Sequence, residues 1–156
     1  MKLTDLLKKE MIVPELKGEG KEDVINELID LFKNDPRVDD IERVRAAVMA
    51  RENIMSTGVG KNFAIPHGKT DAVDDVLCAF GKTSKEIEYQ SLDNQPVHLL
   101  FLLVGKENQV SLHIKLLSRI SRMMTRDDFR TQLLEAKTQD EIFELFKQEE
   151  ESFFDL

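Results

Sequence analysis

The sequence contains a single cysteine, which excludes a disulfide within the chain. Cys78 lies in the apolar run 76–80, and such a run is typical of a buried strand. A free cysteine in this setting packs as a small hydrophobic side chain. We therefore predict a buried structural thiol rather than a catalytic one.

Long apolar runs are also missing. The longest, 99–104, has the size of a core strand and is far shorter than the ~18 apolar residues that a membrane span needs. The first ten residues interleave charged side chains with leucines, so they lack the continuous apolar region of a secretory signal. These absences predict a cytoplasmic protein with no membrane span.

Positive charge is in deficit, because 22 lysines and arginines face 30 acidic residues and give a net charge of −8. A chain this acidic is a poor candidate for non-specific nucleic-acid binding. Its hydrophobic fraction of 41% is near the globular average, and 156 residues suffice to bury one core. We expect one domain over residues 1–156 and no nucleic-acid partner.

Strand-like and helix-like segments alternate along the chain. Segments 76–80 and 97–104 have the character of buried strands, and 86–89 alternates like a short exposed strand. Apolar residues recur at helical spacing in 21–33, 40–51, 109–124, 126–136 and after residue 138. This order predicts an α/β fold, a single-domain layered sandwich whose mixed sheet of about five strands is flanked by helices. The acidic run 149–151 is expected to be solvated.

The stretch 57–69, TGVGKNFAIPHGK, has the clearest functional character. Its glycines permit close backbone approaches, and residues 63–65 are apolar enough for a buried strand. Pro66 lacks an N–H group, so we expect regular pairing to stop there and leave His67 at a rigid strand end. Such a position suits chemistry, although the pattern fits a surface turn histidine equally well.

Other polar side chains admit a functional and a structural interpretation. Arg51 ends a helix, where the helix dipole favours any arginine. His113 lies in the first turns of a helix, whose N–H groups attract anions, but a bond to a neighbour is an equally ordinary role. His98 begins the central strand and fits a structural histidine. A metal site of His67, His98 and His113 is disfavoured because these residues are scattered and form no His-Glu-x-x-His pattern.

Several motifs, in order along most of the chain, carry a resemblance to one family. They are RENIMSTGVG at 51–60, AIPHGK at 64–69, DNQPVHLLFLLV at 93–104 and LHIKLLSRISR at 112–122. Together they resemble the enzyme IIA domain of the fructose/mannitol class of the bacterial phosphotransferase system, including its nitrogen-regulatory relatives. Lys61-Asn62 departs from the smaller residues usual in the family. Because asparagine tolerates left-handed backbone angles, we expect an altered loop surface and a retained site.

The resemblance implies roles for individual residues. His67 carries a phosphoryl group on Nε2, His113 lies beside it to orient the ring or stabilise the group, and Arg51 contacts the phosphoryl oxygens. The implied donor is an HPr-like phosphocarrier protein, and the acceptor is a cysteine of a IIB domain in sugar uptake. Alternatively, the phosphorylation state of His67 controls binding to regulatory target proteins. No cofactor or metal is implied, because the phosphoryl group moves between protein side chains.

Overall fold

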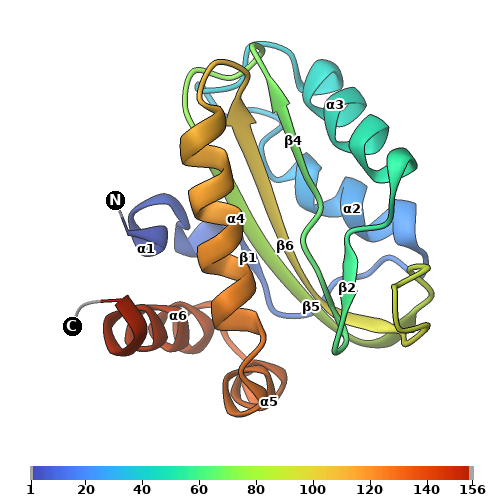
Figure 1. The fold of residues 1–156 in the computed structure, drawn as a ribbon, viewed down its shortest axis with the longest axis vertical. Helices are drawn as coiled ribbons and strands as arrows, with labels where there is room; N and C mark the ends of the chain where they lie inside the picture. Colours follow the sequence, from blue (N-terminus) through green and yellow to red (C-terminus); the bar gives the residue numbers. More distant parts are fainter. Residues whose placement is uncertain (1, 155–156) are drawn as a thin grey trace.

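A six-stranded mixed β-sheet forms the centre of the molecule in the computed structural model, which describes residues 2–154. The strand order is β1-β5-β6-β3-β2, and β4 also pairs with β6 (Figure 1). The strands are β1 (Ile12–Val13), β2 (Gly58–Gly60), β3 (Phe63–Ala64), β4 (His67–Thr70), β5 (Leu77–Ile87) and β6 (Val97–Lys106). The layered α/β class predicted from the sequence is confirmed, with one strand more than the expected five.

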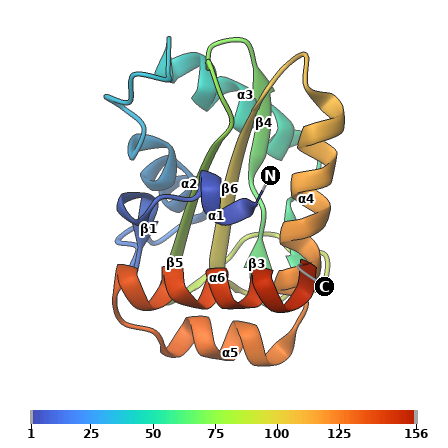
Figure 2. The ribbon, with the colours of Figure 1, turned by 90° about the vertical axis from the view of Figure 1, so that its left-hand side faces the viewer.

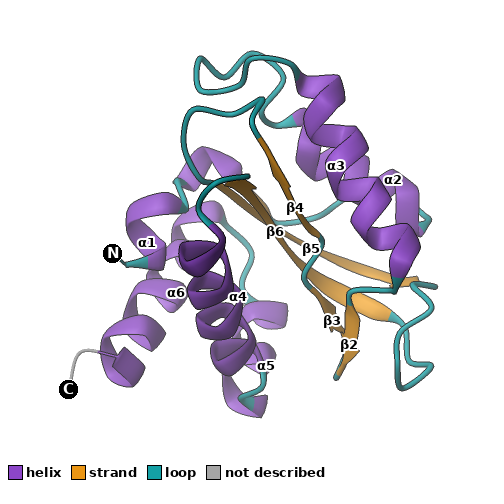
Figure 3. Cartoon of the chain, turned by 45° about the horizontal axis from the view of Figure 1, so that its top comes forward, coloured by secondary structure: helices purple, strands orange, loops and turns teal. Residues whose placement is uncertain are grey.

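Helices cover both faces of this sheet. They are α1 (Leu3–Leu6), α2 (Lys21–Asp30), α3 (Ile41–Ile54), α4 (Val110–Met124), α5 (Asp127–Glu135) and α6 (Gln139–Phe154), with a 3₁₀ turn at Lys9–Met11. Figure 3 shows α2 and α3 on one side of the sheet and α1, α4, α5 and α6 on the other. In residues 2–154, no helix combines the length and the apolar character needed to cross a membrane.

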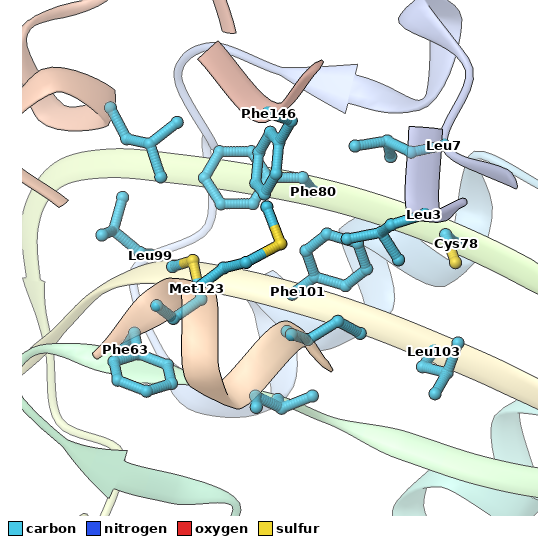
Figure 4. Packing of buried hydrophobic residues seen from close by; sticks show 14 of the residues in the cluster. Leu3, Leu7, Phe63, Cys78, Phe80, Leu99, Phe101, Leu103, Met123 and Phe146 are labelled. Atoms are coloured by element: carbon cyan, nitrogen blue, oxygen red, sulfur yellow. The ribbon is translucent and has the colours of Figure 1, made fainter. Parts of the chain in front are cut away.

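Strand β6 divides the core in two because its side chains alternate between the faces of the sheet. Leu99, Phe101 and Leu103 pack with α4, α5 and α6, whereas the intervening leucines pack with α2 and α3. Both sets are fully buried, which explains the nearly continuous apolar run in the sequence. On the first face, the ring of Phe146 meets those of Phe80 and Phe101 edge-on, at centroid distances of 5.0 and 5.6 Å (Figure 4).

Pro66 interrupts the strand, as predicted, but pairing with β6 resumes directly after it. Strand β3 pairs parallel with β6 through Ala64 and Leu100, and β4 resumes in the same register with His67 opposite Leu103. Proline removes only a donor. The Pro66 carbonyl still accepts a hydrogen bond from the Leu103 amide, at 3.1 Å. His67 therefore lies at a strand end, as predicted, but as the first residue of β4, with paired residues before and after it along β6.

Two local predictions were wrong. Segment 86–89 is not an exposed strand: β5 extends to Ile87, and Tyr89 is fully buried. The acidic run is not solvated throughout, because Glu150 is 1% exposed. Its carboxylate accepts hydrogen bonds from the Thr4 amide and hydroxyl, at 3.0 and 2.9 Å, where α1 lies against α6 (Figure 2). The amides at the start of a helix need acceptors, and a carboxylate supplies them.

The turn between β2 and β3 contains two non-glycine residues with left-handed backbone angles. Lys61 has φ 57° and Asn62 has φ 68°. Asn62 accommodates this conformation as expected, and its side chain donates to the Pro96 carbonyl at 2.8 Å. Lys61 gains only a backbone bond, from its amide to Asp93 at 3.0 Å. Lysine has no side-chain group that favours this conformation, so Lys61 is the strained residue of the turn.

Replacing this lysine tests the strain. Lys61→Gly relieves the left-handed conformation and keeps the amide that bonds Asp93, so we expect the free energy of unfolding to rise by about 1 kcal/mol. Urea denaturation measures the change. Glu86→Gly, at an exposed position of β5, is the control and should lower stability by about 0.5–1 kcal/mol. A loss of stability in Lys61→Gly as large as in the control would contradict the assignment of strain.

Candidate functional site

His67 lies in a pocket of about 500 Å³ between α3 and α4. Strand β4 supplies His67 and Lys69, α3 supplies Arg51, and α4 supplies His113. The structure thus brings together the three side chains singled out in the sequence, from segments that are far apart along the chain. Apolar residues form much of the remaining wall: Ala47, Ala50, Ile54, Ile114 and Leu117.

The imidazole of His67 has a defined orientation. Its Nδ1 lies 2.8 Å from the carbonyl oxygen of Ile65. A carbonyl only accepts, so Nδ1 carries the proton and donates. The other ring nitrogen, Nε2, therefore keeps its lone pair. This is the arrangement that an imidazole needs to act as a nucleophile through one chosen nitrogen.

Glycines allow the two helices to approach the strands at the site. A Cβ on Gly68 would lie 3.0 Å from the backbone of Ala47 and Val48, so α3 packs directly against β4 only because this side chain is absent. A Cβ on Gly105 would lie 2.6 Å from Nδ1 of His113. The His113 ring therefore occupies space that any other residue at position 105 would fill.

His113 lies beside His67 and is buried. The ring centroids are 5.5 Å apart with an interplanar angle of 53°, and His113 is 5% exposed. Among the described residues, neither of its ring nitrogens has a hydrogen-bond partner. Buried polar atoms are usually paired. The two unpaired ring nitrogens of His113, next to a second imidazole, therefore distinguish this pocket from ordinary packing.

Arg51 contributes positive charge from the last turn of α3. Its Nη1 donates to the Met55 carbonyl at 2.9 Å, which holds the guanidinium at the end of its own helix. No carboxylate forms an ion pair with it within residues 2–154. The remaining guanidinium donors are thus available to an anionic group in the pocket.

Both imidazoles favour the neutral form. Burial is the main cause that lowers the pKa of His67, and the charges of Arg51 and Lys69 lower it further, against the Ile65 bond and Glu52, which raise it. Burial lowers the pKa of His113 to about 4, with smaller contributions from His67 and Lys69. At neutral pH the pocket therefore holds two neutral imidazoles near permanent positive charge.

His98 does not join the site. Its Nδ1 bonds the Thr83 carbonyl at 3.0 Å, and it lies five residues from Leu103 along β6, or roughly 16 Å at the usual rise per strand residue. It has the structural role expected by default. The described part of the chain contains no group of three His, Cys, Asp or Glu side chains that could hold a metal ion.

A buried polar cluster behind the pocket was not predicted. Glu52 is 4% exposed and bonds Thr57 and Tyr89, with Lys21 as its ion-pair partner. Glu52 directly follows Arg51 in the motif that resembles the family, yet nothing in the spacing indicated burial. The four residues come from four segments, so only the tertiary fold reveals the cluster.

Comparison with known proteins identifies the family of the chain. Residues 5–149 match the family described as the phosphoenolpyruvate-dependent sugar phosphotransferase system, EIIA 2. The chain belongs to this family. EIIA domains of this system are phosphotransfer proteins, and a phosphocarrier role follows for this chain at that level. The resemblance predicted from the sequence motifs is confirmed.

Three similar proteins represent the two branches of the family. The chain is 37% identical over 148 residues to the fructose-specific EIIABC component of Bacillus subtilis, covering 95% of this chain but only 23% of that protein. It is 34% identical to a nitrogen regulatory protein of Bradyrhizobium diazoefficiens, and this match covers 85% of this chain and 86% of that protein. The structure matches nitrogen regulatory protein IIA-Ntr from Neisseria meningitidis with a TM-score of 0.85 and 25% identity, covering 92% of this chain and 98% of that one.

The unusual environment of His113 predicts a pH dependence of stability. Its pKa is about 4 in the folded state and 6.5 ordinarily, so between these pH values the unfolded chain binds more protons than the folded one. Stability is then full above pH 6.5 and falls as the pH drops toward 4, by at most about 1.4 kcal/mol per pH unit for this one proton.

Two measurements check this effect. An NMR titration of the His113 ring, assigned by the signal missing in His113→Gln, should have its midpoint near pH 4. Unfolding free energies between pH 7 and 4 should fall more steeply for the parent chain than for His113→Gln. A His113 midpoint near 6.5 with parallel stability curves would contradict the prediction.

Proposed function

We propose that His67 carries a phosphoryl group between two partner proteins, accepting it from an HPr-like phosphohistidine carrier and passing it to a cysteine of a IIB domain. The observation that carries this proposal is the bond between His67 Nδ1 and the Ile65 carbonyl, at 2.8 Å. This bond keeps the ring proton on Nδ1 and leaves the lone pair on Nε2, which is then the nucleophile. Histidine is among the side chains that form covalent intermediates in this way.

In each transfer, one bond to phosphorus forms while another breaks, and no third reactant is needed. In the first, the Nε2 lone pair of His67 attacks phosphorus, the N–P bond of the donor breaks, and its electron pair returns to the donor imidazole. As Nε2 is bonded, the ring gains positive charge, which the Nδ1–H bond to Ile65 stabilises. In the second, a cysteine thiolate attacks phosphorus, the Nε2–P bond breaks, and His67 regains its lone pair.

Phosphoryl transfer depends mainly on in-line positioning and on stabilising the negative charge of the phosphoryl oxygens. Arg51 supplies a planar donor for these oxygens from the pocket wall. His113 lies 5.5 Å from His67 between ring centroids, and its ring nitrogens have no partner among the described residues, so one N–H of its neutral ring is available to the same oxygens. Lys69, which is exposed, adds charge at the rim.

The rim of the pocket suits transient docking. Ile54 is 79% exposed and Ile114 is 60% exposed, and they lie on α3 and α4 on either side of His67. Large exposed apolar side chains beside a reactive group are typical of an interaction surface. A phosphorylated partner would bury them while its own phosphoryl group reaches Nε2.

The second candidate function is regulatory. It is favoured by the similarity to proteins named nitrogen regulatory protein, which covers 85% of this chain and 86% of that from Bradyrhizobium diazoefficiens. In this function the phosphoryl group on His67 is not passed to IIB. It adds about 1.5–2 negative charges to an apolar rim, so a target protein binds one phosphorylation state and not the other.

Phosphorylation itself is the first test. Incubation with phosphoenolpyruvate, enzyme I and HPr should add one phosphate to the protein, detected by intact mass. His67→Ala should add none, because the acceptor nitrogen is gone. His98→Ala, which removes a histidine outside the pocket, is the matched control and should still accept one phosphate. Normal phosphorylation of His67→Ala would refute the assignment.

The acceptor decides between the two functions. After phosphorylation with ³²P, we expect the label to move to a fructose-class IIB domain within seconds to minutes, and a IIB variant lacking its cysteine should take none. Label that stays on the protein, together with pull-down of partners by only one phosphorylation state, would support the regulatory function instead.

A further inference from the structure

Glu52 is a buried carboxylate at the end of α3, next in sequence to Arg51 but turned away from the pocket that Arg51 lines. Its side chain is 2% exposed. A carboxylate this deeply buried is rare unless its oxygens are satisfied. The partners it has, and the residues to which they lead, indicate a role beyond packing.

The carboxylate of Glu52 accepts four bonds. Oε1 accepts from the Thr57 hydroxyl at 2.6 Å and from the Tyr89 hydroxyl at 3.1 Å. Oε2 accepts from the Thr57 amide at 2.8 Å and pairs with the Lys21 ammonium at 2.9 Å. Four bonds fill the usual acceptor capacity of a carboxylate. Glu52 therefore fixes Thr57 through both its backbone amide and its side chain.

Thr57 connects Glu52 to Ile65, the residue whose carbonyl bonds His67. With its amide and hydroxyl bound by Glu52, its third polar group, the carbonyl, accepts the Ile65 amide at 3.1 Å. The carbonyl of the same Ile65 accepts Nδ1–H of His67 at 2.8 Å. One continuous series of hydrogen bonds thus joins the buried carboxylate to the imidazole, through Thr57 and Ile65.

We propose that Glu52 is a positioning residue for His67, acting through Thr57 and Ile65 to hold the Ile65 carbonyl where it selects the Nδ1–H tautomer. The consequence for phosphoryl transfer rests on the proposed function, whereas the effect on the tautomer does not. Glu52 touches neither the imidazole nor the pocket, so in selecting the tautomer it acts by placing the acceptor of the Nδ1 proton, while its charge also raises the pKa of His67.

The sequence order of the motif fits this role. The single helical turn that ends α3 presents Arg51 to the pocket and Glu52 to the interior, so one element sets both a charge in the pocket and the anchor behind it. Lys21, whose ammonium also lies 4.6 Å from the centre of the Tyr89 ring, compensates the buried negative charge.

The tautomer is the direct test. In ¹⁵N-labelled protein at pH 7.5, long-range ¹H–¹⁵N spectra distinguish Nδ1–H from Nε2–H for each histidine. The parent chain should show His67 almost entirely as Nδ1–H. Glu52→Gln keeps the shape but replaces one acceptor oxygen by an amide group that cannot accept, and it removes the charge that pairs with Lys21. We expect this loosened anchor to give a clear fraction of Nε2–H in His67. An unchanged tautomer in folded Glu52→Gln would overturn the proposal.

Variants at Thr57 keep the proposal testable if Glu52→Gln does not fold. Thr57→Val removes the hydroxyl bond to Glu52 at constant shape and should shift the His67 tautomer in the same direction. Thr57→Ser restores the hydroxyl and should restore the Nδ1–H form. If Thr57→Val gives the same His67 spectrum as the parent chain, or if Thr57→Ser shifts it as far as Thr57→Val does, the proposal fails.

Thr83 offers a matched control. It is also a buried threonine whose hydroxyl donates to a carboxylate, that of Glu15 at 3.0 Å, and its carbonyl accepts Nδ1 of His98. Thr83→Val thus removes an equivalent bond behind a different histidine. It should leave the His67 spectrum unchanged. A shift of His67 in this control would show that the effect reflects general loosening of the fold.

The functional consequence is measured separately. With enzyme I and HPr, we expect Glu52→Gln and Thr57→Val to slow phosphorylation of His67 by roughly tenfold to 100-fold. Part of the phosphate should move to Nδ1, which the ³¹P shift of the phosphohistidine reports. If the parent chain accepts no phosphate, the proposed function fails, while the tautomer spectra still decide the positioning role. If the parent accepts phosphate and both variants match its rate and regiochemistry, the positioning role fails alone.

Discussion

The parallel pairing of β3 and β4 with one strand, β6, is the constraint on which the site depends. Both short strands keep a single register along β6, with Ala64 opposite Leu100 and His67 opposite Leu103. Because β6 is buried on both faces, that register is fixed by the two halves of the core. The Ile65 carbonyl lies in the gap between the two short strands, so the pairing fixes the chain on either side of it, and the bond from the Ile65 amide to Thr57 constrains the residue itself.

Packing around this strand produces the electrostatics of the pocket. The missing side chains of Gly68 and Gly105 let α3 and the His113 ring come close enough to enclose His67. Enclosure lowers the pKa of both imidazoles, and Arg51 and Lys69 add to the effect on His67. A neutral imidazole next to cationic groups is the state that our proposal requires, and it arises from burial more than from any single charged contact.

Sequence reasoning succeeded where one local pattern decides the structure and failed where distant segments decide it. Helical periodicity predicted α2 to α6, and the apolar run predicted β6. The break at Pro66 was predicted, but the resumption of pairing after it was not, because the Pro66 carbonyl still accepts a hydrogen bond from β6. Tyr89 and Glu150 were assigned to the surface from their polar neighbours, but a partner across the fold buries each of them. For the same reason, Glu52 was visible in the motif while its connection to His67 was not.

The buried ring of His113 lowers the stability of the fold. A buried polar group without a partner destabilises a protein by about 1–3 kcal/mol, and both ring nitrogens of His113 are in this state among the described residues. An apolar side chain of similar volume would pack here at no such cost. This loss of stability is expected if the pocket binds an anion, because the phosphoryl oxygens on His67 would provide the acceptor that the protein does not. Under our proposal, the N–H of the neutral His113 ring gains an acceptor when His67 is phosphorylated, so the burial of this ring beside His67 favours the phosphorylated state.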